Sequence, residues 1–200
     1  TSHRVPNALE AAEAVGRKAG ERAVARLNPR KLATQSAPVL LTPQIAGGFI
    51  GHAISALFGG SLYRKTSFLL DSIGKPVFAP LVDVVDDPFI AQAYASSPFD
   101  QEGVTCQRRS IIEKGVVRGY FLSAYSARKL GMQSTGNAGG NHNLLVTPTM
   151  RGDTAVLARQ MGRGLVVTEL MGQGVNPVTG DYSRGAAGFW VEGGEIAYPV

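Results

Sequence analysis

Apolar residues near the start of the chain recur at near-helical spacing. They predict a helix over about residues 8–27, and the stripe consists of Leu9, Ala12, Ala19, Ala23 and Leu27. Asn7 followed by Glu10 resembles a capping box at the beginning of this helix. Asn28-Pro29 ends it, because proline cannot continue a helix.

A second helix is predicted over about residues 43–58. Thr42 is suited to cap it and Pro43 to occupy its first position, and the apolar spacing indicates a largely buried helix. The helix contains Gly47, Gly48 and Gly51, and these glycines predict that a neighbouring element approaches it closely. The pair Gly59-Gly60 ends the helix.

The rest of the chain is dominated by short β-rich runs. Strands are expected at 37–41, 77–85, 104–112, 116–122, 143–146 and 165–170. Turn residues 113–115 predict one hairpin, and Gly193-Gly194 between 189–191 and 196–198 predicts another. Short helices are expected at 87–96 and 154–161. Because strands outnumber crossover helices, the pattern predicts an α+β fold with a mostly antiparallel sheet or a barrel-like domain.

Composition excludes several classes of protein. With 200 residues, 44% of them hydrophobic, the chain can bury one substantial core. No run approaches the roughly 20 uncharged apolar residues of a membrane helix, and residues 1–10 do not resemble a signal peptide. Cys106 is the only cysteine, which excludes an internal disulfide and a thiolate zinc cluster. These features predict a cytoplasmic protein.

The net charge of +5 is concentrated near the N-terminus. Residues 1–40 hold seven of the 20 Lys and Arg side chains against three of the 15 acidic ones. The cluster consists of Arg17, Lys18, Arg22, Arg26, Arg30 and Lys31. No aromatic residue is interleaved among them for base stacking, so a solvated helix face is favoured over a nucleic-acid site.

Several separate blocks of the sequence resemble the PmbA/TldE branch of the TldD/PmbA family, once called modulators of DNA gyrase and grouped with the metallopeptidases. The blocks are 60–65 (GSLYRK), 125–131 (YSARKLG), 134–136 (STG) and 170–200. The resemblance implies a longer protein with an N-terminal α/β domain before this segment and a further β segment after it. Residues 1–36 would then be a helix and linker from the N-terminal region, and 37–200 a C-terminal domain incomplete at its end.

A metallopeptidase helix needs two His side chains on one face and a Glu beside the first. Here His3, His52 and His142 are the only histidines, and no two lie within one helical turn. In the TldD branch the helix carries His-Glu, three further residues, and His. At the matching positions this chain has Gly47, Gly48 and His52. The resemblance therefore implies a degenerate motif and no metal in this chain.

Two further segments are candidates for contacts with a peptide or a partner. Tyr63, Arg64 and Lys65 match the family block that follows the metal helix; they either line a peptide channel or form surface salt bridges. The glycine-rich segment 136–143 either presents polar groups to a peptide backbone or forms a tight loop without a ligand. Its candidate residues are Asn137, Asn141, His142 and Asn143. His52 is either a polar contact or a hydrogen-bonded residue at a helix end.

The resemblance implies a non-catalytic subunit of a two-subunit metalloprotease that processes or degrades unfolded peptides, as in peptide-antibiotic maturation and antitoxin turnover. A TldD-like partner would hold the zinc, and extended peptides would be the substrates. Whether the chain forms a homo-oligomer when alone is left open. One alternative is a stand-alone metallopeptidase that uses His52 and His142, and another is a gyrase modulator or DNA-binding protein.

Overall fold

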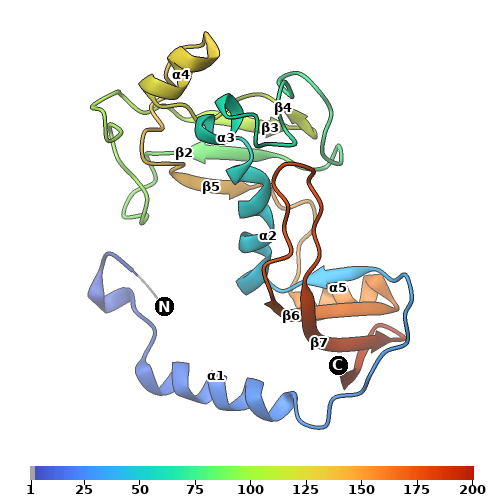
Figure 1. The fold of residues 1–200 in the computed structure, drawn as a ribbon. Helices are drawn as coiled ribbons and strands as arrows, with labels where there is room; N and C mark the ends of the chain where they lie inside the picture. The colour runs from blue at the N-terminus through green and yellow to red at the C-terminus, as the bar shows by residue number, and fades with distance from the viewer. Residues whose placement is uncertain (1–2) are drawn as a thin grey trace. The chain divides into compact units, whose positions relative to one another are not determined.

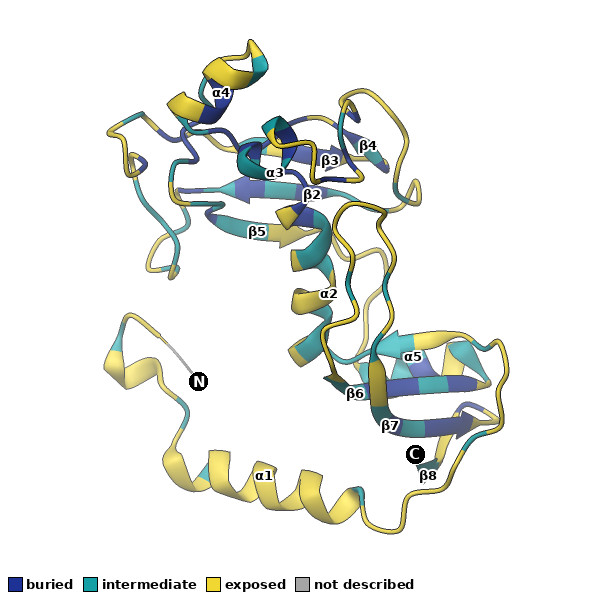
Figure 2. Ribbon diagram, in the orientation of Figure 1, coloured by how far each residue is buried: buried dark blue, intermediate teal, exposed yellow. Residues whose placement is uncertain are grey.

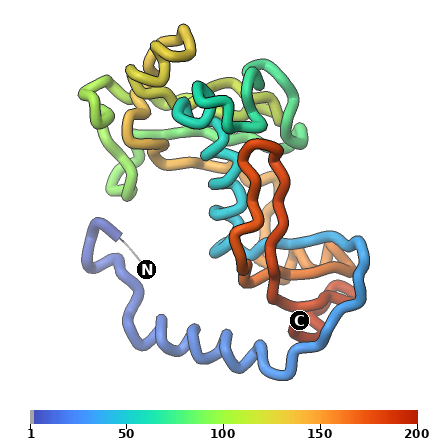
Figure 3. The backbone as a smooth tube through the Cα atoms, in the orientation of Figure 1, coloured from blue at the N-terminus to red at the C-terminus, as the bar shows by residue number. Residues whose placement is uncertain are grey.

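The computed structural model describes residues 3–200, whose segments form two compact units. Unit 1 contains residues 3–9, 52–149 and 176–180, and unit 2 contains 10–51, 150–175 and 181–200. The units are interleaved along the sequence, as the colour gradient of the tube shows (Figure 3). Each unit is built around its own four-stranded sheet.

Unit 1 contains an antiparallel sheet with the strand order β4-β3-β2-β5 (Figure 1). Its strands are β2 (Val84–Asp87), β3 (Arg109–Glu113), β4 (Val116–Val117) and β5 (Asn143–Val146). Burial alternates along β2, so Val84 and Asp86 lie on its buried face. A charged side chain at such a position requires polar partners.

Two short helices of unit 1 pack against each other, and they are α3 (Gly59–Tyr63) and α4 (Ala124–Leu130). Ser123 and Ser126 form a reciprocal capping box at the beginning of α4, and Gly131 ends it in the left-handed conformation. A methyl group at Gly59 would come within 2.5 Å of the Ser126 side chain, so glycine allows the two helices to approach closely.

Unit 2 contains a mixed sheet with the strand order β1-β6-β7-β8. The strands are β1 (Val39–Leu41), β6 (Gly164–Met171), β7 (Gly185–Glu192) and β8 (Glu195–Pro199). Strand β1 is parallel to β6, and the other pairs are antiparallel. Helix α5 (Thr154–Met161) covers the sheet, where Ala158 packs with Val166 and Val191.

The first helix of the chain begins later than the sequence predicts. A 3-10 turn (η1, Pro6–Ala8) precedes α1 (Ala12–Ala25), and the N-cap Ala11 has no side-chain bond. The predicted start and capping box of this helix are therefore wrong. None of its residues is buried, as its yellow colour shows (Figure 2).

A helix forms within the predicted range 43–58, but the expectation that it is largely buried is wrong. Helix α2 (Pro43–Ser55) buries only Ile54, and a methyl group at Gly47, Gly48 or Gly51 would meet nothing within 4 Å. An apolar pattern indicates that a helix face is suited to burial, but burial also requires another element to pack against that face. The described residues bury only the C-terminal end of α2.

The β-rich pattern after residue 77 was predicted correctly in type. The predicted strand 143–146 and helix 154–161 coincide with β5 and α5, and both predicted hairpins form. The sheets are open and do not close into a barrel. The predicted helix at 87–96 is absent: Asp87 ends β2, its side chain accepts the Phe89 N–H in an Asx turn, and 88–96 form turns and irregular structure. Among residues 3–200, no helix combines the length and apolar character needed to cross a membrane.

The hairpin between β7 and β8 provides a test of backbone constraint. Gly193 and Gly194 both have positive φ angles, of 60° and 83°, but only at Gly194 would a methyl group collide with the α5 backbone, 2.9 Å from the Arg159 Cα atom. We expect Gly193→Ala to reduce the free energy of unfolding by about 1 kcal/mol. Gly194→Ala should cost roughly 1–3 kcal/mol more, because overpacking adds to the strain.

Urea unfolding followed by the fluorescence of Trp190, the single tryptophan, measures this difference within unit 2. Equal losses in the two variants would show that α5 does not constrain the turn.

Candidate functional site

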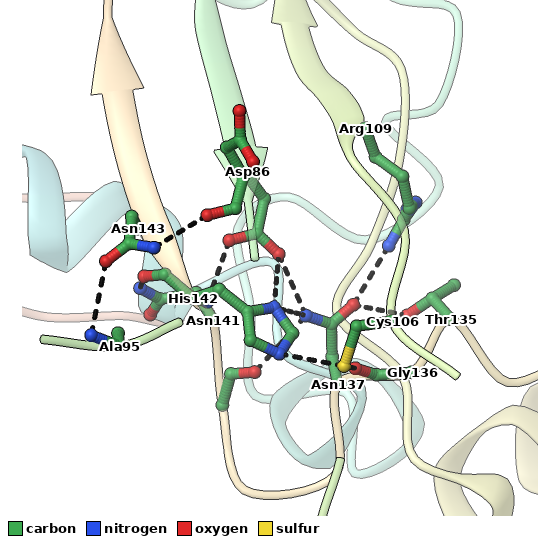
Figure 4. Close-up of polar contacts among 12 residues, drawn as sticks. Asp86, Ala95, Cys106, Arg109, Thr135, Gly136, Asn137, Asn141, His142 and Asn143 are labelled. Carbon is green, nitrogen blue, oxygen red and sulfur yellow. Dashed lines mark hydrogen bonds and ion pairs between the residues drawn. The ribbon is translucent and has the colours of Figure 1, made fainter. Parts of the chain in front are cut away.

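The site is organised around the carboxylate of Asp86, which is fully buried on β2. Its Oδ1 atom accepts the backbone N–H of His142 at 2.7 Å. Its Oδ2 atom accepts the side-chain amide of Asn137 at 3.0 Å and lies 3.1 Å from His142 Nδ1 (Figure 4). Both donor residues belong to residues 136–143, the glycine loop. Asp86 therefore ties this loop to the central strand of the sheet.

The imidazole of His142 lies between a carboxylate and a thiol. Its Nδ1 atom faces Asp86, and its Nε2 atom lies 3.1 Å from Cys106 Sγ. These partners favour the tautomer in which Nδ1–H donates to Asp86 and Nε2 accepts from the thiol. The thiol also lies 3.4 Å from the carbonyl oxygen of Gly136, at the other end of the loop.

Asn137 connects this cluster to strand β3. Its Oδ1 atom accepts from Arg109 Nη1 at 3.0 Å and from Thr135 Oγ1 at 2.8 Å. Arg109 is the β3 neighbour of Asp86 and also donates to the carbonyl oxygen of Tyr120 at 3.0 Å. Burial lowers the pKa of Arg109, and the charge of Asp86 opposes this effect. The network thus joins β2, β3 and the glycine loop.

Cys106, His142 and Asp86 follow one another at distances typical of a nucleophilic triad. A nucleophilic cysteine needs an exposed thiolate, however, and Cys106 is only 1% exposed. Burial raises the pKa of its thiol, and the charges of Asp100 and Asp86 raise it further. The arrangement therefore stabilises a neutral thiol that acts as a hydrogen-bonding group.

Asp100 holds the glycine loop from a second side. Its Oδ2 atom accepts the N–H of Ala138 at 2.9 Å, and its Oδ1 atom accepts the N–H groups of Glu102 and Val104. Burial works to raise the pKa of the Asp100 carboxyl, but these three backbone donors hold that pKa below its ordinary value. The ionised form of Asp100 is therefore the one that fits this turn.

Two hollows flank the glycine loop, and Gly139 and Gly140 line both. The tyrosine pocket, of about 290 Å³, is lined by Phe58, Tyr63, Phe121, Tyr125 and Asn137, together with Gly and Ser residues. The histidine pocket, of about 350 Å³, is lined by Phe99, Asp100, Gln101, Asn141 and His142, among others. Both are open depressions on a loop surface, a form suited to an extended chain.

The structure brings some of the predicted site residues together. Tyr63 and Asn137 share the tyrosine pocket, while Asn141 and His142 share the histidine pocket. Lys65 lines neither pocket and lies just beyond the Arg64 C-cap of α3, with a φ angle of 59°.

The side chain of Asn143 bonds to the protein's own backbone and side chains. Its side chain donates to the Asp87 carbonyl oxygen and to Ser96 Oγ, and it accepts the Ala95 N–H. It lines neither hollow, so it holds the 88–97 loop against β5.

The main anchors of the network were not singled out from the sequence. They are Asp86, Asp100, Cys106 and Arg109. A signal existed for Asp86, because period-2 alternation along 84–87 places it on the same face as Val84. The other three lie 28 to 38 positions before the loop residues that they contact, so spacing gives no indication of these contacts.

Comparison with known proteins identifies the family. The family model described as PmbA/TldA metallopeptidase C-terminal domain matches residues 34–200. The chain belongs to the PmbA/TldD family. A metalloprotease PmbA homolog of Haemophilus influenzae is 54% identical over 186 residues, which cover 93% of this chain and 41% of that protein. Metalloprotease PmbA of Escherichia coli O157:H7 is 50% identical over 200 residues, covering 100% and 44%.

A crystal structure from the same family has a similar fold. The Thermotoga maritima protein, labelled as a candidate modulator of a DNA gyrase, superposes with a TM-score of 0.90 at 31% identity, covering 99% of this chain and 47% of that chain. The chain therefore spans less than half the length of these PmbA/TldD relatives.

The metallopeptidase name of the PmbA/TldD family raises the question of whether this chain could hold a metal. Among residues 3–200, no group of three His, Cys, Asp or Glu side chains is arranged to bind one. Gly47 and Gly48 offer no donor, and both ring nitrogens of His142 already face protein partners. The described residues therefore do not fit a zinc site built on His52 and His142.

Removing the charge of Asp86 should destabilise unit 1. We expect Asp86→Asn to reduce the free energy of unfolding by about 3–5 kcal/mol, because a buried hydrogen-bonded charge is lost and its donors are left without it. The matched control is Asp87→Asn. Asp87 is the next residue on β2, where its side chain pairs with the exposed Arg108 and the expected cost is about 0–1 kcal/mol.

Far-UV circular dichroism during urea unfolding measures both variants. Similar small losses would show that the Asp86 network does not hold the unit together.

Asp100 should make stability depend on pH. Because its folded-state pKa is lowered, its contribution is present above the ordinary aspartate pKa of 3.8 and is lost as the pH falls through the lower, folded value. We expect Asp100→Asn to cost about 1–3 kcal/mol at pH 7. The gap between variant and parent should shrink as the pH falls below about 4. Urea unfolding at several pH values measures this difference in unfolding free energy. A difference that does not change with pH would contradict the lowered pKa of Asp100.

Proposed function

We propose that this chain is part of a PmbA/TldE-like, metal-free subunit of a two-subunit metalloprotease that processes or degrades unfolded peptides. In this proposal, a TldD-like partner holds the zinc and supplies the catalytic groups. The proposal is supported by the sequence of α2, because under the resemblance to the TldD branch Gly47 and Gly48 match the positions of a metal ligand and a general base. The names of the PmbA relatives support the link to proteolysis.

Two features of the fold support a role in holding an extended peptide. The glycine loop lies between two open hollows and is anchored by Asp86 and Asp100, so its backbone is held in place before a ligand arrives. Strands β5 and β1 lie at sheet edges and suit the addition of a peptide strand, whereas residues 74–76 already pair with β4 and the Arg30 N–H donates to Pro199 of β8. Binding through the backbone gives weak selectivity for sequence. His142 acts here as a positioning residue.

A DNA-binding role has less support. Several cations of the N-terminal basic cluster already have protein partners. Lys18 pairs with Glu10, Arg26 pairs with Glu169, and Arg30 lies over the Tyr198 ring, 4.6 Å from its centroid. They do not form a stripe of unpaired charge facing a phosphate backbone.

We further propose a cytoplasmic protein in which 37–200 belongs to the C-terminal domain and 1–36 to the end of the preceding region. The family model covers nearly the same segment, 34–200. Assembly with the TldD-like partner is the functional state in this proposal, and a homo-oligomer would be a resting state.

The decisive measurement is the hydrolysis of an unstructured peptide by the full-length protein alone, by the TldD-like partner alone, and by their mixture. We expect activity in the mixture only, with loss of activity after chelation and in a mixture whose partner lacks its metal-helix glutamate. Hydrolysis by the full-length protein alone, with stoichiometric zinc retained, would contradict the metal-free assignment.

A further inference from the structure

The C-cap of α3 and the last turn of α4 carry three cations arranged around two tyrosine rings. The rings of Tyr63 and Tyr125 meet edge to face, with their centroids 5.7 Å apart. The guanidinium of Arg64 lies 5.2 Å from the Tyr63 centroid. Arg128 and Lys129 lie 5.8 and 5.7 Å from the Tyr125 centroid. These five residues form the tyrosine–cation surface.

The cations of this surface have no acidic partner within the described chain. None of the ion pairs among residues 3–200 includes Arg64, Arg128 or Lys129. The carboxylate of Glu102 reaches the beginning of α4, but it accepts the N–H of Ala124 at 2.7 Å. All three cations are exposed, so their charge is available to an external anion.

The tyrosine pocket opens beside these cations. Its volume of about 290 Å³ is close to the lower limit of small-molecule sites, roughly 300–1,000 Å³. It has room for one side chain, and Phe58 and Phe121 supply apolar contact. Arg64 Nη2 lies only 3.2 Å from where a methyl group on Gly60 would stand, and Gly60 lines the pocket. The Arg64 guanidinium is therefore at the rim.

Arg64 is also held in place before any ligand binds. Its Nη1 atom donates to the hydroxyl of Tyr63 at 3.1 Å, and the guanidinium lies over the same ring. A guanidinium that is already oriented loses less side-chain entropy when it binds a carboxylate. An anion paired with it next to an apolar pocket is partly shielded from water, which strengthens the pairing.

We propose that the tyrosine–cation surface binds an acidic segment of an extended polypeptide. An Asp or Glu carboxylate pairs with the cations, and a neighbouring apolar side chain enters the tyrosine pocket. This inference rests on the proposed function for the polypeptide nature of the ligand. It adds a preference for acidic residues next to an apolar one, which backbone binding alone does not give.

The test uses two fluorescent ten-residue peptides, each with one Phe. One has Glu on both sides of the Phe and the other has Gln, and both are acetylated and amidated so that only side-chain carboxylates differ. Fluorescence anisotropy with the full-length protein should show binding of the Glu peptide at least about tenfold tighter at low salt. That advantage should fall between about 0.05 and 0.3 M NaCl.

A matched pair of double variants assigns the effect to this surface. Arg64→Gln with Arg128→Gln should lower the affinity for the Glu peptide by at least about fivefold and leave the Gln peptide unchanged. Lys75→Gln with Lys114→Gln removes the same charge from exposed positions of the same unit, and should change either affinity by less than about twofold. Circular dichroism checks that both variants fold.

Equal binding of the Glu and Gln peptides, or an equal loss in the control variant, would overturn the proposal. A single-stranded oligonucleotide of the same charge that binds as tightly through Arg64 and Arg128 would overturn the assignment to a polypeptide. Because binding is measured without a partner subunit or cleavage, the result is separate from the hydrolysis experiment. An inactive mixture would contradict the two-subunit function while leaving a measured Glu preference intact.

Discussion

A fully buried carboxylate must be surrounded by donors, and this requirement shapes unit 1. Asp86 sits on the central strand β2 and has no access to water. Its donors come from the glycine loop, whose backbone and side chains therefore have to fold back over the sheet. Without them the charge would cost several kcal/mol. The position of the loop is thus set by the need to supply hydrogen-bond donors to the buried carboxylate of Asp86.

The same requirement determines what the loop can do. Asn137 and His142 use their polar groups on Asp86, Arg109 and Cys106, so neither is a free chemical group. What remains open to solvent is the glycine backbone between two hollows and the ring of aromatic and basic side chains beside it. Such a surface can hold a ligand, and among residues 3–200 no group of three His, Cys, Asp or Glu side chains is arranged to bind a metal. The proposed substrate-holding role rests on this surface, and the relatives of the chain are named metalloproteases.

Local patterns were enough to predict part of the structure. Helix α5 and the Gly193-Gly194 hairpin depend on neighbours in sequence, and both were predicted. Strand β5 was also predicted, from its own short apolar run, although its partner β2 lies far away in sequence. The burial of α2 was not predictable, because it depends on elements that the pattern does not name. For the site, the glycine loop was recognised from its composition. Its anchors Asp86 and Cys106 were not, because their contacts join residues 56 and 36 positions away and only the folded sheet brings them together.

The interleaving of the two units has a consequence for how this region can change during evolution. The chain passes repeatedly from one unit to the other, and the tip of the β6–β7 connection, 176–180, belongs to unit 1 although both strands belong to unit 2. Neither unit is a continuous stretch that gene fusion or recombination could transfer by itself. Exchange of this region is therefore expected to involve both units together, and substitutions on α2 would leave the interleaved scaffold around it in place.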